Sequence, residues 1–105
     1  MKAIINGLRY DTDKATLIGE ASSDESLSDF RYWSAGLYVT PRSKRYFLAG
    51  EGGAMTIWSR SLGNDGRTGG DGIIPLDYDG ALEWAERNLS ADQIEAAFCE
   101  TIEDA

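Results

Sequence analysis

Residues 37–49 read LYVTPRSKRYFLA, and this stretch predicts how the chain folds. Its two ends, 37–40 and 45–49, are rich in the aromatic and aliphatic residues that favour strands. Between them, residues 41–44 (PRSK) combine proline with small and polar residues, as tight turns do. Two strands joined by so short a connection pair in antiparallel fashion. We therefore expect an antiparallel meander that includes this hairpin.

A second hairpin is expected at the N-terminus. Lys2–Ile5 and Leu8–Tyr10 are short β-favouring runs. The Asn6-Gly7 pair between them accepts the positive φ angles of a type I′ turn, the commonest two-residue hairpin connection. A short third strand is expected at 15–19, and the polar, acidic segment 20–29 is expected to be a surface loop.

The chain that follows the central hairpin predicts short strands around a long loop. Residues 55–58 (MTIW) are expected to form a strand after the glycine-rich bend at 50–53. Residues 61–72 (SLGNDGRTGGDG) contain five glycines and almost no apolar side chains, so we expect an exposed loop there. A short last strand is expected at 73–74.

Two helices are expected in the last third of the chain. Asp77 or Asp79 can cap a helix over residues 80–88 by accepting hydrogen bonds from backbone N–H groups. The sequence SADQ at 90–93 is a capping-box pattern, which predicts a second helix over about 91–100.

The order of these elements predicts the fold class. Strands come first and helices last, which indicates an α+β fold. We expect an antiparallel β-sheet, made of the N-terminal hairpin plus the meander, with two C-terminal helices packed on one face. Trp84 and Phe98 are expected to attach the helices to the sheet. A length of 105 residues suits a single domain that spans residues 1–105.

Composition predicts where the protein resides. The apolar runs are too short to span a bilayer, and the N-terminus lacks the long apolar stretch of a signal peptide. The one cysteine cannot form an internal disulfide, which fits a reducing compartment. We therefore expect a cytoplasmic protein that makes no membrane contact.

Charge is distributed unevenly along the chain, whose net charge is −8. Residues 1–60 carry eight Lys or Arg against seven Asp or Glu, whereas residues 61–105 carry two against eleven. Direct nucleic-acid binding is disfavoured, because affinity for phosphates comes from clustered cations. Two explanations stay open: the acidic half attracts a basic protein surface, or it only keeps the protein soluble.

No pattern in the sequence predicts catalysis or a bound cofactor. The chain has no histidine, which removes the commonest general base and most zinc sites. Cys99 has no identifiable activating partner, so we expect a structural thiol. The GEGG sequence at 50–53 lacks the Lys-Ser/Thr pair of a P-loop. We expect a non-enzymatic protein without a cofactor or a metal site.

Two groups of residues are candidates for binding a partner. The first group is acidic and lies on the expected helices, where carboxylates three or four residues apart can imitate the spacing of nucleic-acid phosphates. Its members are Glu83, Glu86, Asp92, Glu95 and Glu100. The second group combines cations with aromatic side chains, the composition of interface hot spots. Its members are Arg31, Tyr38 and Arg45. The alternative explanations are a solvated helix face for the acidic group and core packing for the aromatic residues.

Six motifs stand in order along the chain between Met1 and Phe98: MKAIINGLRYDT, SDFRYW, LYVT, RYFLAGEGGAM, GDGIIPLD and ALEWAERNLSADQIEAAF. This ordered set resembles small proteins that phages, plasmids and other mobile elements encode. The function of that family is mostly unassigned, so the resemblance implies no catalytic residues.

The genomic setting of the family resembles that of anti-CRISPR proteins, which are small, often acidic and non-enzymatic inhibitors. The resemblance therefore implies that the partner is a host protein complex, with a CRISPR–Cas subunit as the expected target and acidic DNA mimicry as the mechanism. The alternative is a structural or accessory interaction module of a mobile element, joined as a homodimer through exposed aromatic side chains. Both oligomeric states, monomer and homodimer, stay open.

Overall fold

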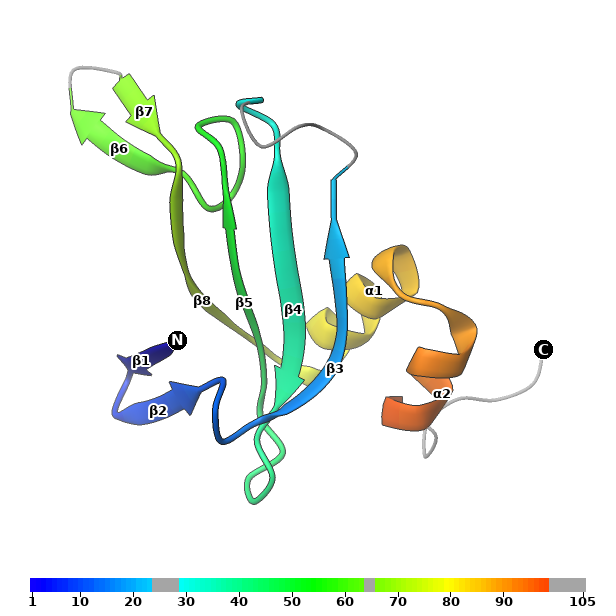
Figure 1. The fold of residues 1–105 in the computed structure, drawn as a ribbon. Coiled ribbons are helices and arrows are strands. Elements are labelled where there is room, and N and C mark those ends of the chain that lie inside the picture. The colour runs from blue at the N-terminus through cyan, green and yellow to red at the C-terminus, as the bar shows by residue number, and fades with distance from the viewer. Residues whose placement is uncertain (24–28, 64–65, 99–105) are drawn as a thin grey trace.

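A four-stranded antiparallel sheet forms the centre of the computed structural model, which describes residues 1–23, 29–63 and 66–98 (Figure 1). Its strands, in spatial order, are β3 (Thr16–Ser22), β4 (Trp33–Val39), β5 (Tyr46–Gly52) and β8 (Gly70–Leu76). The central hairpin is β4 and β5, in which Tyr38 pairs with Phe47. This confirms the hairpin that the sequence of residues 37–49 predicts.

Two small hairpins accompany the central sheet. The first joins β1 (Lys2–Ile5) to β2 (Leu8–Asp11) as a separate two-stranded sheet. Its turn has φ angles of 52° at Asn6 and 79° at Gly7, the left-handed values that a type I′ turn requires. The second joins β6 (Arg60–Gly63) to β7 (Gly66–Thr68) and projects from the upper end of the sheet (Figure 1).

Three predictions for irregular and extended segments are wrong. Within the predicted loop at 61–72, residues 61–63 belong to β6, residues 66–68 form β7 and residues 70–72 begin β8. β6 pairs with β7, and residues 70–72 pair with residues 50–52 of β5, so hydrogen bonding between strands outweighs the glycine-rich composition. Residues 55–58 form hydrogen-bonded turns instead of a strand. The predicted loop over 20–29 begins later than expected, since β3 continues to Ser22, and residues 24–28 lie outside the described part of the chain.

The two helices begin at the predicted capping residues. Asp77 accepts a hydrogen bond from the Gly80 N–H at 2.7 Å and caps α1 (Tyr78–Asn88). Ser90 and Gln93 exchange hydrogen bonds at the start of α2 (Ala91–Phe98), which confirms the capping box. Neither of these helices is long and apolar enough to cross a membrane.

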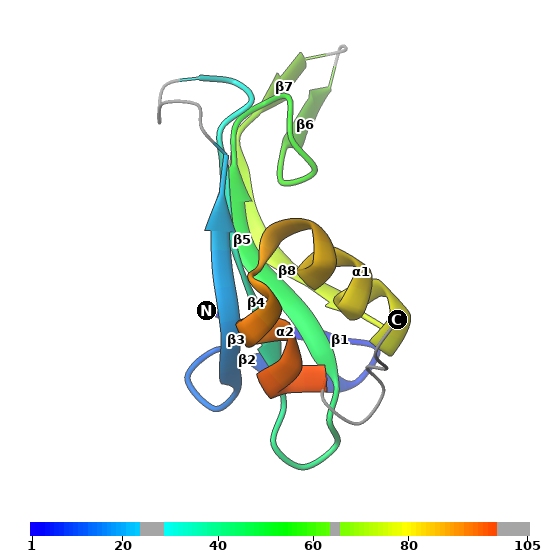
Figure 2. The same cartoon turned by 90° about the vertical axis from the view of Figure 1, so that its right-hand side faces the viewer.

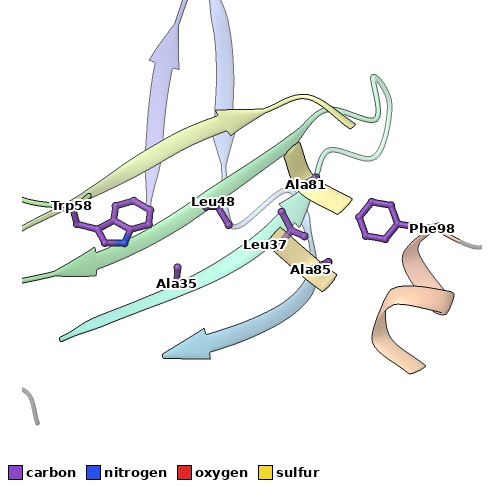
Figure 3. Close-up of a cluster of buried hydrophobic side chains, with 7 residues drawn as sticks. All are labelled: Ala35, Leu37, Leu48, Trp58, Ala81, Ala85 and Phe98. Atoms are coloured by element: carbon purple, nitrogen blue, oxygen red, sulfur yellow. The ribbon is translucent and has the colours of Figure 1, made fainter. Parts of the chain in front are cut away.

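Both helices lie on the same side of the sheet (Figure 2). Side chains alternate between the two faces of a strand, and Leu37 and Leu48 point toward α1, whose buried residues are Ala81 and Ala85. Figure 3 shows this core as a row of side chains with Phe98 at one end. The α+β fold with helices on one face is therefore confirmed.

The opposite face of the sheet has a smaller core of its own. Phe47 is fully buried there, stacks on Tyr38 at 5.3 Å, and meets Tyr10 of β2 edge-on at 5.4 Å. These contacts attach the N-terminal hairpin to the central sheet.

Phe98 attaches α2 to the main core, and its removal should destabilise the fold. The ring is 2% exposed and stacks on Tyr46 at 5.5 Å. Phe98→Ala should lower the free energy of unfolding by about 3–5 kcal/mol in denaturant melts, since it leaves a cavity as well as losing apolar contact. Phe30→Ala is the matched control, because Phe30 is 67% exposed. An equal loss in both variants would show that Phe98 has no special role.

Candidate functional site

All three tryptophans of the chain line one hollow at the upper end of the sheet, on the helix side. Trp33 comes from the start of β4, Trp58 from the segment after β5, and Trp84 from α1. The hollow has a volume of about 330 Å³. We call it the tryptophan groove, and its lining consists of Arg31, Trp33, Ala35, Met55, Thr56, Ile57, Trp58, Trp84 and Asn88.

The three indoles reach the groove from different directions. Trp33 shares the helix-side face of β4 with the buried Ala35. Trp84 is half-buried beside the alanine face of α1. Trp58 is the most enclosed of the three and forms the end of the main core opposite Phe98 (Figure 3). The groove is therefore continuous with the core rather than added to it.

A pair of tight turns over residues 53–59 forms one wall of the groove. The Met55 N–H donates to the Phe30 carbonyl at 2.8 Å, which attaches the turns to the segment just before β4. The Thr56 hydroxyl donates to the Gly53 carbonyl at 2.8 Å and accepts from the Trp58 N–H at 3.2 Å. These bonds direct Trp58 inward and leave Met55 and the following Ile57 facing solvent.

The rim of the groove exposes large apolar side chains. Ile57 is 74% exposed and Met55 is 71% exposed, the two highest values for such residues in the described part of the chain. The Phe30 backbone lies beside the turns, because its carbonyl accepts the Met55 hydrogen bond, and its side chain is 67% exposed. Large exposed apolar side chains that gather at one hollow are typical of an interaction site.

Arg31 is the one ionisable residue among the lining residues, all of which lie in the described part of the chain. Its backbone N–H donates to the Asp29 carboxylate at 2.7 Å, and its guanidinium Nε lies 3.3 Å from the same oxygen. These bonds lower the pKa of Asp29, so the carboxylate stays ionised at neutral pH. The hold on Arg31 is lost only as pH falls through that lowered pKa.

The structure does not bring Arg31, Tyr38 and Arg45 together. Tyr38 stacks on Phe47 on the opposite face of the sheet, beside the N-terminal hairpin. Arg45 lies just before β5 and lines a different hollow, between the lower end of the sheet and α2. Of the three predicted residues, Arg31 alone lines the groove.

The acidic candidates lie at the surface of the helices. Glu83 forms an ion pair with Arg87 at 2.8 Å, so one carboxylate of the predicted row is already neutralised by its own helix. Glu86, Asp92 and Glu95 are exposed and form no ion pair with another described residue. Glu100 and Cys99 lie outside the described residues. The role of these carboxylates stays a prediction.

The described residues contain no group of three or more His, Cys, Asp or Glu side chains arranged to hold a metal ion.

No protein-family model matches the chain, and no curated protein or solved structure matches it. The resemblance to small phage and plasmid proteins therefore stays a prediction, and the functional argument depends on the geometry of the groove.

Gly52 makes room for the turns and for Trp58. An added Cβ at this position would lie 2.9 Å from the Trp58 Cδ1 atom. Gly52→Ala should therefore displace the turns and lower the free energy of unfolding by about 1–3 kcal/mol, the usual range for overpacking. Denaturant melts measure the effect. Met55→Ala removes an exposed side chain from the same segment and should change stability by less than about 0.5 kcal/mol. Equal stability of both variants would contradict this account of Gly52.

Proposed function

We propose that this protein is a non-enzymatic binding protein and that it binds another protein through the tryptophan groove. One observation carries the proposal: the three indoles and the two most exposed apolar side chains of the described chain meet at one place. Aromatic residues, methionine and arginine are the residues enriched at protein interfaces, and the groove contains all three kinds.

The character of the groove favours a protein over other ligands. Its volume of about 330 Å³ is at the low end of the range for small-molecule sites, roughly 300–1,000 Å³. A nucleic acid would require clustered cations, whereas Arg31 is already paired with Asp29. Apolar side chains from the surface of another protein suit both the small volume of the groove and its lack of net charge.

Ile57→Glu tests this function. A carboxylate at the rim must be desolvated when a partner covers the groove, so capture of the partner should fall by more than about tenfold. The measurement is quantitative pull-down from a bacterial lysate that contains CRISPR–Cas complexes. Ile4→Glu is the matched control, because Ile4 is 69% exposed on the N-terminal hairpin. Equal capture by both variants would overturn the proposal.

A second candidate function is inhibition of a host defence complex, of the anti-CRISPR type, through the acidic surface of the helices. The exposed carboxylates of Glu86, Asp92 and Glu95 favour it, together with the absence of a basic residue from the described α2. In this mechanism the carboxylates occupy a basic groove that otherwise holds nucleic acid.

Charge reversal of Glu83, Glu86, Asp92 and Glu95 to lysine tests the second candidate. Binding should be abolished, because each attraction to a basic surface becomes a repulsion. Stability should change by only a few tenths of a kcal/mol per site, since exposed carboxylates contribute little to folding. Wild-type binding should also weaken steeply with salt. Normal binding by the quadruple variant, in a competition assay with nucleic acid, would exclude this mechanism.

A further inference from the structure

We propose that the tryptophan groove binds a second copy of this chain in a two-fold symmetric dimer. In this dimer the Met55 and Ile57 side chains of each copy enter the groove of the other copy. The inference rests on the proposed function of the groove and names its partner.

The first argument is that a hollow and protruding side chains occupy the same patch. A two-fold interface is formed by the same surface on both subunits, so that surface must be complementary to itself. The groove supplies the hollow, and the turns over 53–59 supply two apolar side chains that are more than two-thirds exposed at its rim. Apposed copies could therefore bury both sets of side chains together.

The second argument concerns charge. The chain carries a net charge of −8, so two copies repel each other unless the surfaces that meet are free of net charge. At the groove, Arg31 is balanced by Asp29, and the α1 pair Glu83–Arg87 stands next to Trp84. Among the described residues, the exposed carboxylates of Asp92 and Glu95 lie on α2 and do not line the groove. This apolar patch with paired charges is therefore a surface on which a second copy can bind.

The third argument is that the protruding side chains are held in place before binding. Hydrogen bonds attach the start of the turns to the segment before β4: the Gly53 N–H donates to the Tyr32 carbonyl and the Met55 N–H to the Phe30 carbonyl, both at 2.8 Å. A preordered surface loses less conformational entropy when it associates.

Sedimentation velocity of the purified full chain, over a wide concentration range, tests the dimer. We expect a species of twice the chain mass that dissociates on dilution. Added salt should strengthen it, because salt screens the repulsion between two acidic chains. Ile57→Glu and Met55→Glu should each weaken the dimer by more than about tenfold in dissociation constant. Ile4→Glu should leave the dimer unchanged.

Two measurements keep the result decisive. Thermal melts followed by circular dichroism establish that each variant is folded. A photoreactive amino acid at position 57 should cross-link two copies, and the same group at position 4 should not. The cross-link tests the dimer in a chain without a glutamate substitution, so the test holds even where a glutamate variant fails to fold. A chain that stays monomeric, or a dimer that persists in folded Ile57→Glu and Met55→Glu, overturns the inference.

The outcomes separate this inference from the proposed function. If the chain is monomeric and Ile57→Glu still reduces capture of a different protein, the proposed binding function stands and the dimer is excluded. A cross-link from position 57 to another protein alone leads to the same conclusion. If Ile57→Glu changes neither self-association nor capture, both proposals fail.

Discussion

The close contact between α1 and the central sheet determines the arrangement of the helix side of the molecule. Ala81 and Ala85 are fully buried in the same core as Leu37 and Leu48. Because alanine side chains are short, the helix can lie close to the strands, and its larger side chains must then occupy the flanks. Trp84 is one of them, and it borders the tryptophan groove. The position of the groove is thus a consequence of how the helix packs.

Much of the fold could be predicted from the sequence because local chemistry specifies it. The Asn6-Gly7 turn, the proline-containing turn over 41–44, the Asp77 cap and the Ser90–Gln93 capping box each involve residues within a few positions of one another. Such signals do not depend on the rest of the chain, and all of them stand where the sequence predicts. The α+β fold class follows from their order.

The site could be predicted only in part, because it depends on contacts between distant residues. The sequence indicates an aromatic cluster around Arg31, but it does not show that Trp84 and Trp33, about fifty residues apart, line the same hollow. The glycine-rich stretches predict a bend and a loop, whereas Gly52 and Gly70 face each other across β5 and β8. That pairing extends the sheet toward the turns over 53–59.

The gathering of every tryptophan into one groove also gives the molecule a built-in optical reporter. Indole emission changes with the polarity of its surroundings, and in most proteins the signal is an average over unrelated places. Here all three indoles line the same hollow, two of them only half-buried. The intrinsic fluorescence of the unlabelled chain therefore reports on a single surface, so anything that covers or distorts that surface alters the spectrum directly.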